Sequence, residues 1–545
     1  MGPRAMSLVG GGPRLQARVT KDVDATHPLR NLPGMRRRFI LAGATLLLGA
    51  APAPLPVDLL IRGGTVYPGD AAPFTGDVAV AGDRIAATGK RLAVTARHVV
   101  DARGMVVAPG FIDPHTHMGE ALASPDARTR LVEAFLLQGV TTAFIGNDGG
   151  GAVDVAAVLG GAAARPVGIN YAAWIGFGQV RQAVIGGADR APDAGELARM
   201  RRLVARAMCD GALGLSTGLF YAPQSFAKTD EVVALAREAG LRGGLYDSHI
   251  RDESSYSIGL HTAVAEAIAI GRQAGLPVNI SHIKALGVDV QGQSGRVIAA
   301  VRAARAAGQR VTADQYPWDA SGTSLVAALV PGWAQDGGRA ALLRRLDDPR
   351  LRAGMAENLR RRGGAAKLLI TQGREAGRTL AQLARDADPV LTAVAIIRRG
   401  DPAVASFNQS EADIRAFMQE PWVMTGSDAS DGHPRVYGSF ARKWAEYVRR
   451  GVLSPRAFVA RGATLTADTF GLAARGRLRA GGFADVVVFD PARYAARATY
   501  AQPTLTASGV RTVLVNGVAA VENGRLTGAA AGRALPRTPR PGSCP

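Results

Sequence analysis

The stretch Phe111-Ile-Asp-Pro-His115-Thr-His117 ends an apolar, β-branched run that begins at Val106. On a strand, residues i and i+2 face the same side, so His115 and His117 should point into one cavity. Two imidazoles presented in this way suit a divalent metal such as zinc. A solvated or core pair of histidines would give the same pattern, so this stretch by itself leaves both interpretations open.

The chain is large, basic and poor in cysteine. Its 545 residues, 47% of them hydrophobic, suffice for one large barrel with an accessory domain or for three smaller domains. The net charge of +20 comes almost wholly from arginine, because only six of the 65 basic residues are lysines. The arginines are scattered over expected helix faces without interleaved aromatics or a nucleic-acid-binding motif, which favours a basic solvated surface and no nucleic-acid partner.

Two cysteines, Cys209 and Cys544, exclude a disulfide framework and a CxxC metal site. We expect Cys209 to be a small core residue of a helix.

The N-terminal segment predicts export. Residues 1–34 lack periodicity, and we expect them to be an upstream extension of the reading frame. Residues 35–56 combine basic residues, the apolar run Phe39–Ala51 and Ala-Pro repeats, which is typical of an export signal. The Arg-Arg-x-Phe-Ile pattern resembles a twin-arginine signal and predicts a periplasmic or secreted protein. A retained membrane anchor is the alternative, because Pro54 follows the candidate cleavage site.

Short alternating strands broken by glycine occupy residues 57–108 and return over residues 471–525. The later group is divided by Asn516-Gly517 and Asn523-Gly524 turn signals. The two ends of the chain are therefore predicted to build one β-sandwich. Residues 526–545, rich in Ala, Arg, Pro and Gly, are predicted to be a disordered tail.

Residues 109–470 alternate short apolar strands with Ala/Leu/Arg-rich helices, which predicts a (β/α)8 TIM-like barrel. A long segment, about 321–420, is then an insertion between barrel strands 7 and 8 that can cover the mouth. The expected strands are Val106–Asp113, Thr141–Asn147, Val167–Ile175, Ala212–Thr217, Gly244–Ser248, Val278–Ser281, Arg310–Gln315 and Trp422–Ser427.

Candidate ligands follow these strands at their carboxyl ends, where barrels carry their chemistry. Four of the eight histidines in the chain fall at such ends, which a random scatter would not produce. The full set, in chain order, is His115 and His117 after the first strand, Asp148 after the second, His249 after the fifth, His282 after the sixth and Asp428 after the eighth.

From about Asp58 to Gly524 the chain resembles the N-acyl-D-amino-acid deacylase (D-aminoacylase) family of the metal-dependent amidohydrolase superfamily. The His-x-His pair and the late aspartate are shared across that superfamily, whereas two segments, Gly-Leu-Ser-Thr-Gly-Leu and His-Pro-Arg, are far more specific to the family. The motifs are Pro109–His117, Gly211–Leu219, Ser248–Glu253, Ile280–Lys284, Tyr316-Pro317 with Ala320–Thr323, Gly426–Asp428 and His433–Gly438.

The resemblance implies zinc as the cofactor. It assigns His249 and His282 to one tight site, and His115, His117 and Asp428 to a second, weaker position. The family places a cysteine after the second strand, where this chain has Asp148. A carboxylate can also ligate or bridge zinc, so we keep Asp148 as a ligand.

The resemblance also implies the reaction and its substrate. Zinc with an open position lowers the pKa of a bound water towards about 7, and Asp428 is expected to act as general base and then general acid. Lys284, Tyr316 and Arg435 are expected to bind a substrate carboxylate, since arginine offers a bidentate fork. We expect hydrolysis of small N-acyl-D-amino acids to a carboxylate and a D-amino acid.

Two further departures from the family pattern concern specificity: Phe177 stands where histidine is common, and Trp318 where a second tyrosine is usual. Another amidohydrolase, acting on cyclic amides or D-peptides, is the alternative enzyme. Hydantoinases and dihydroorotases carry a carboxylated lysine, yet lysine is absent from residues 91–227. A non-catalytic barrel scaffold would have lost its ligands. The preferred side chain, the number of metals and the oligomeric state stay open.

Overall fold

The computed structural model describes residues 55–544. The predicted extension, residues 1–34, and nearly all of the predicted signal, residues 35–56, lie outside this range. Within the described residues, no helix is both long and apolar enough to cross a membrane.

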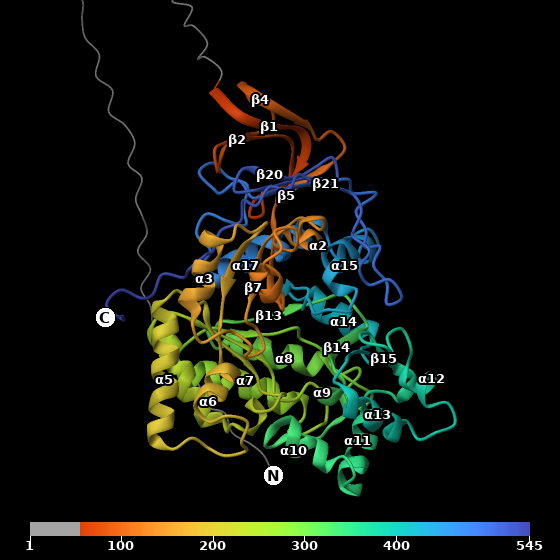
Figure 1. The fold of residues 1–545 in the computed structure, drawn as a ribbon. Helices are drawn as coiled ribbons and strands as arrows, with labels where there is room; N and C mark the ends of the chain where they lie inside the picture. Colours follow the sequence, from red (N-terminus) through yellow and green to blue (C-terminus); the bar gives the residue numbers. More distant parts are fainter. Residues whose placement is uncertain (1–54, 545) are drawn as a thin grey trace, which may run out of the picture. The chain divides into compact units, whose positions relative to one another are not determined.

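Strands from both ends of the described chain share one nine-stranded sheet. Figure 1 shows part of this sheet, with β1, β2 and β4 at the top of the view. β5 joins the two groups, because it pairs in parallel with β1 and antiparallel with β18. The sequence predicts a sandwich of these segments; the structure links them as one continuous hydrogen-bonded path. The strands are β1 (Leu55–Val66), β2 (Phe74–Ala81), β3 (Arg84–Gly89), β4 (Val94–Asp101), β5 (Val106–Pro109), β18 (Val486–Phe489), β19 (Val510–Val515), β20 (Val518–Glu522) and β21 (Arg525–Leu526).

The run Val106–Asp113, expected as one strand, is divided at Gly110 into β5 and β6 (Phe111–Thr116). A Cβ atom at Gly110 would lie 2.2 Å from the Thr141 hydroxyl, so only glycine fits there. The break lets β5 join the terminal sheet while β6 carries the two histidines into a second layer.

The second layer consists of parallel strands, each overlapping one that the sequence predicts. β6, β7 and β8 form one sheet, and β9 to β13 with β17 form another. Trp174 alone separates β8 from β9, and Thr116 of β6 forms a parallel bridge with Ala429, just beyond β17. These strands are β7 (Val140–Ile145), β8 (Asn170–Ala173), β9 (Ile175–Gly176), β10 (Gly214–Gly218), β11 (Leu245–His249), β12 (Val278–Ile280), β13 (Val311–Gln315) and β17 (Val423–Thr425).

Helices alternate with these strands and bury apolar faces against them. α5 begins at a capping box, in which the Asp193 carboxylate accepts from the Glu196 backbone amide and the Glu196 side chain accepts from the Asp193 amide. The other helices of this layer are α1 (Gly119–Ala123), α2 (Glu133–Leu136), α3 (Val155–Ala164), α4 (Phe177–Val184), α6 (Thr229–Leu241), α7 (Leu260–Ala274), α8 (Ser294–Ala306), α14 (Glu411–Gln419), α15 (Arg435–Arg442), α16 (Pro455–Val459) and α17 (Leu465–Phe470), and α5 spans Ala194–Cys209.

The segment between β13 and α14 builds a unit with its own apolar core, which includes Leu325, Leu351 and Ile397. Its three-stranded antiparallel sheet has the order β14-β16-β15. Figure 1 shows its helices α10 to α13 gathered away from β1, β2 and β4. The elements are β14 (Ala320–Ser324), α9 (Leu325–Leu329), α10 (Gly338–Arg345), α11 (Pro349–Arg361), β15 (Leu368–Ile370), α12 (Leu380–Ala384), α13 (Pro389–Arg399) and β16 (Ala403–Phe407).

The prediction of a disordered tail is wrong for the part that the structure describes. The Tyr171 amide donates to the Arg533 carbonyl at 3.0 Å, and the Leu535 amide donates to the Tyr171 carbonyl at 2.7 Å. Cys544 forms a disulfide with Cys209, so the expectation that Cys209 is only a small core residue is also wrong. Main-chain hydrogen bonds and a crosslink hold this segment, and neither leaves a hydrophobic pattern in the sequence.

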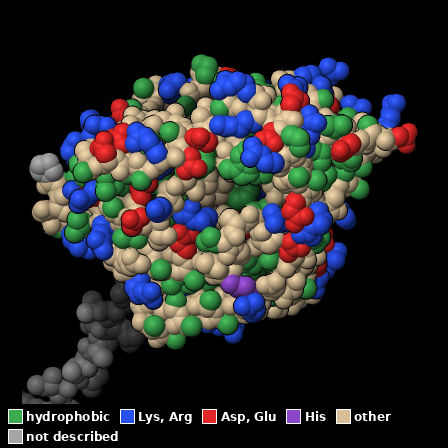
Figure 2. Space-filling view, turned by 90° about the horizontal axis from the view of Figure 1, so that it is seen from below, with side chains coloured by type: hydrophobic (Ala, Val, Ile, Leu, Met, Phe, Trp, Pro, Cys, Tyr) green, Lys and Arg blue, Asp and Glu red, His purple; other side chains and the backbone are tan. Residues whose placement is uncertain are grey.

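The face drawn in Figure 2 carries basic side chains interspersed with acidic ones. Ion pairs at exposed or partly exposed positions of the described chain include Arg360 with Asp289 and Arg398 with Asp347. The high arginine content is thus partly balanced by local ion pairs on the surface.

Lys443 is fully buried, and its Nζ donates to the Thr425 hydroxyl at 3.0 Å. Burial, assisted by the charge of Arg461, lowers the pKa of Lys443 to about 7. Below that pH the folded protein buries an ammonium ion. Between about pH 7 and the unfolded pKa of about 10.4, the unfolded state binds the extra proton, so stability rises with pH.

Lys443→Met should therefore raise the melting temperature most at pH 6, where it removes a penalty on the order of 5 kcal/mol, and much less at pH 10. Calorimetric melting across this range measures the effect. An equal shift at both pH values would show that Lys443 is not a buried titrating group.

Candidate metal centre

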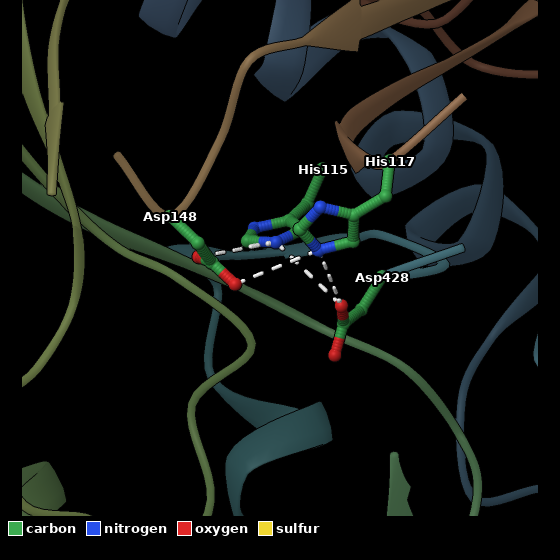
Figure 3. A group of neighbouring side chains, drawn as sticks. All are labelled: His115, His117, Asp148 and Asp428. Atoms are coloured by element: carbon green, nitrogen blue, oxygen red, sulfur yellow. Dashed lines mark hydrogen bonds and ion pairs between the residues drawn. The ribbon is translucent and has the colours of Figure 1, made fainter. Parts of the chain in front are cut away.

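Six predicted ligands converge at the carboxyl ends of the parallel strands. Their donor atoms form two groups, within each of which all atoms lie within 4.8 Å of one another, and Asp148 belongs to both. Figure 3 shows the first group, with the two imidazoles and two carboxylates pointing toward one another. The groups are His115, His117, Asp148 and Asp428, and Asp148, His249 and His282.

The spacing of the donor atoms fits zinc. Ligands on a tetrahedral zinc with bonds near 2.1 Å lie about 3.4 Å from one another. The distance from the Asp148 carboxylate is 3.4 Å to His115 Nε2, 3.5 Å to His117 Nε2 and to His282 Nε2, and 3.6 Å to His249 Nδ1. His117 Nε2 lies 3.2 Å from Asp428 Oδ1.

Several of these buried donor atoms have no hydrogen-bond partner among the described residues: both ring nitrogens of His115 and of His249, and Asp148 Oδ1. An unsatisfied buried polar atom is costly, so such a cluster calls for a bound group. A metal ion accepts one ring-nitrogen lone pair from each histidine and one oxygen lone pair from the carboxylate. The residues present therefore fit a metal.

Three of the candidate ligands have a strained backbone conformation. Asp148, His282 and Asp428 have φ values of 56°, 35° and 50°, in the left-handed region that side chains other than glycine rarely adopt. Such strain persists only where the surrounding fold over-determines it, and it clusters at functional sites. Here it turns side chains that follow β7, β12 and β17 toward one point.

Glu253 belongs to the site, although the sequence assigned it no role. Its carboxylate lies 3.1 Å from His282 Nδ1 and 3.7 Å from His249 Nε2, and it accepts a 2.5 Å hydrogen bond from Lys284 Nζ. A carboxylate on the outer nitrogen of a ligating histidine fixes the orientation of the ring. A glutamate four residues after a strand-end histidine was the available signal.

Buried carboxylates also lie beneath the ligands. Asp113 and Asp247 precede His115 and His249 by two residues, so strand alternation places each pair on one side of its strand. Asn279 donates to both Asp247 and Asp314, and the Asp314 carboxylate accepts from the His282 backbone amide. Burial raises the pKa of Asp113 to about 7 and that of Asp247 to about 6.

Arg435 is buried beside the expected catalytic base. Its Nη1 lies 2.6 Å from Asp428 Oδ2, its Nη2 donates to the Ser430 hydroxyl at 2.7 Å, and its guanidinium lies 4.9 Å from the centre of the Tyr316 ring. Burial by itself raises the pKa of Asp428, but the Arg435 charge and the neighbouring histidines together outweigh it and hold that pKa well below its usual value. Asp428 is therefore ionised and ready to accept a proton.

A cavity of about 420 Å³ is lined by every predicted site residue except His115, which is fully buried. Its walls include Lys284, Tyr316 and Arg435. Two aromatic residues that the sequence analysis did not single out also line it: Phe220 and Tyr221, whose ring centres lie 5.7 Å and 4.8 Å from that of His249. They directly follow the Gly211–Leu219 motif, which was the available signal.

Phe177 and Trp318 lie differently from what the sequence suggested. Phe177 is fully buried in the main apolar core and does not line this cavity. Trp318 donates through Nε1 to the Ser439 hydroxyl at 3.1 Å and stacks on the Arg442 guanidinium. Both departures thus affect packing beside the cavity rather than its lining.

Asp148 offers a direct test of the shared ligand. Asp148→Ala should lose metal from both groups, whereas Asp148→Cys should retain it, because a thiolate is a good zinc ligand. Elemental analysis and activity measure the two effects.

Asp148→Asn is the matched control, because asparagine keeps the preference for a left-handed backbone and removes the charge. Metal loss in Asp148→Asn would show that Asp148 acts as a ligand, because the turn is preserved in this variant. Wild-type metal content and rate in Asp148→Ala would mean that the residue only forms the turn.

An α/β fold with an accessory β domain, and imidazoles and carboxylates gathered at the strand ends, define a metal-dependent hydrolase. No family model matches the chain. It is 35% identical over 517 residues to a D-aminoacylase of Alcaligenes xylosoxydans xylosoxydans, covering 89% of this chain and 98% of that protein. It is 36% identical over 494 residues to an N-acyl-D-glutamate deacylase of the same organism, covering 85% and 93%.

A crystal structure of N-acyl-D-glutamate deacylase from Bordetella bronchiseptica, complexed with zinc and a phosphonate inhibitor, is 32% identical and superposes with a TM-score of 0.75. The match covers 88% of this chain and all of that one. The chain belongs to the N-acyl-D-amino-acid deacylase (D-aminoacylase) family of metal-dependent amidohydrolases.

Proposed function

We propose that this protein is a zinc-dependent hydrolase of N-acyl-D-amino acids, releasing a carboxylate and a D-amino acid. One observation carries the proposal: a single cavity combines the metal-donor cluster with Lys284 and Arg435, two buried cations suited to a substrate carboxylate. The relatives named above support the same class of substrate.

His249, His282 and Asp148 would hold the tighter zinc, and His115, His117, Asp148 and Asp428 a weaker second ion. When bound, zinc polarises the amide carbonyl and lowers the pKa of a water molecule. Asp428 Oδ1, beside His117, accepts the proton of that water and delivers it to the leaving nitrogen. Arg435, Lys284 and Tyr316 hold the α-carboxylate, so the scissile amide stays over the ligands.

We also infer that the parallel strands close into a (β/α)8 barrel. The single residue between β8 and β9 and the bridge from Thr116 to Ala429 both support closure. The segment between β13 and α14 then serves as the insertion that walls the cavity, since Ser321, Arg362 and Val404 line it.

Export remains part of the proposal. The Cys209–Cys544 disulfide supports an oxidising compartment such as the periplasm. The apolar run Phe39–Ala51 supports an export signal.

The test is a hydrolysis screen of the purified protein with matched N-acetyl-D- and N-acetyl-L-amino acids, before and after metal removal and zinc replacement. We expect release of D-amino acids only, loss of activity with a chelator and recovery with zinc. Equal rates on both enantiomers, or activity confined to cyclic amides, would overturn the proposal.

A further inference from the structure

Arg362 is a buried cation that the proposed reaction does not use. It follows α11, is 2% exposed and lines the cavity above the metal donors. Its Nε donates to the Ala328 carbonyl at 2.9 Å and its Nη1 to the Ser406 hydroxyl at 3.1 Å. Among residues 55–544, Nη2 has no hydrogen-bond partner and no carboxylate lies within ion-pair distance of the guanidinium.

Other buried arginines show how unusual this is. Arg181, Arg435 and Arg475 each pair with a carboxylate, of Glu231, Asp428 and Asp485 respectively. Arg130 and Arg461 have no carboxylate partner within the described part of the chain, but each donates to two or more main-chain carbonyls and neither lines the cavity. A buried cation without a counter-charge is costly. Arg362 therefore calls for an anion that comes from outside the chain.

Two unsatisfied hydroxyls line the same cavity. Ser321 is 6% exposed, and its hydroxyl has no hydrogen-bond partner among the described residues. The Tyr256 hydroxyl is buried and equally unpartnered, and the Arg362 guanidinium lies 5.6 Å from the centre of its ring. Ser321 and Tyr256 both line the cavity. Three donors that line this cavity thus lack an acceptor among the described residues.

The register of the small sheet brings Arg362 close to Ser321. Ser321 of β14 lies opposite Ser406 of β16, which accepts from Arg362, so both serines share one face of the sheet. The adjacent Gly322 lies against Arg435, since a Cβ atom there would come within 3.1 Å of Arg435 Nη2. Arg362 and Arg435 both line the same cavity of about 420 Å³, so a substrate bound there can contact both cations.

We propose that Arg362, Ser321 and Tyr256 bind a second carboxylate of the substrate, and that this position selects dicarboxylic N-acyl-D-amino acids. The inference rests on the proposed function. The carboxylate can belong to the amino-acid side chain, as in N-acetyl-D-glutamate, or to the acyl group, as in N-succinyl-D-leucine. A guanidinium with two hydroxyl donors suits a carboxylate in either position, whereas a neutral aliphatic group would leave all three donors unpaired.

The experiment compares kcat/KM of zinc-loaded protein for N-acetyl-D-glutamate, N-succinyl-D-leucine and the neutral N-acetyl-D-leucine. The wild type should prefer one dicarboxylic substrate over the neutral one. The preferred substrate shows whether the bound carboxylate belongs to the amino-acid side chain or to the acyl group. In Arg362→Gln, the ratio of dicarboxylic to neutral kcat/KM should fall about 100-fold. Ser321→Ala and Tyr256→Phe, which change one hydroxyl each, should lower it by about 5- to 10-fold.

Arg361→Gln is the matched control. The Arg361 guanidinium lies 5.7 Å from the same Tyr256 ring, but it pairs with Glu357 and does not line the cavity. The ratio of dicarboxylic to neutral kcat/KM in Arg361→Gln should equal that of the wild type. An unchanged ratio in Arg362→Gln, Ser321→Ala and Tyr256→Phe would overturn the inference and leave the proposed function standing. A wild type that cleaves no N-acyl-D-amino acid would overturn both.

Discussion

His282→Ala and His249→Ala should each lose zinc and activity together, with the rate falling by at least about three orders of magnitude. The reason is geometric, because His249 Nδ1 and His282 Nε2 both face Asp148 Oδ2, at 3.6 Å and 3.5 Å. Losing one of three ligands leaves too few donors to hold the tighter ion. His115→Ala should lower activity while most of the zinc stays bound, because His115 belongs to the other group.

Elemental analysis of the purified variants, with circular dichroism to confirm folding, measures these effects. His261→Ala is the matched control: its ring lies on α7 and bonds to Gln293 at 2.7 Å, and it belongs to neither ligand group. It should keep full zinc. A full complement of metal in His282→Ala would show that the tighter site lies elsewhere.

Arg435→Ala should reduce kcat/KM for an N-acyl-D-amino acid by roughly two to three orders of magnitude. Removing one partner of a buried, hydrogen-bonded charge costs about 3–5 kcal/mol. Arg435→Lys should lie in between, because lysine keeps the charge but loses the fork. The structure adds a second effect, since Arg435 also pairs with Asp428 at 2.6 Å. Its loss should raise the pKa of the catalytic base.

A substrate ester that lacks the free carboxylate separates the two effects. Its hydrolysis should fall only about tenfold in Arg435→Ala, through Asp428 alone, so the selectivity for the free acid should drop. Steady-state kinetics on acid and ester, followed across pH, measures both. An equal fall on the two substrates would mean that Arg435 acts only by positioning Asp428, and the case for a carboxylate substrate would lose its main support.

Local patterns in the sequence predicted the parallel strands and the six candidate ligands that the structure brings together. Strand alternation aligned His115 with His117, and apolar runs ending in His, Asp or Lys marked the other positions. Each such signal lies within a few residues of the group it predicts. The sequence alone therefore indicated the metal chemistry and the family.

Contacts between distant segments could not be predicted in this way. The break at Gly110 depends on the Thr141 side chain, the ordered tail depends on Cys209 and the edge of β8, and the role of Glu253 depends on two histidines from different strands. Arg362 resembled many other helix-surface arginines until the fold buried it beside Ser321.

The residues and their chemistry were thus determined by the sequence itself, because period-2 alternation and ligand type are local properties. Only the tertiary structure decided which groups share Asp148, which cations remain unpaired and what the cavity can bind. Burial and charge pairing depend on chain segments hundreds of residues apart, and no local pattern encodes their distances.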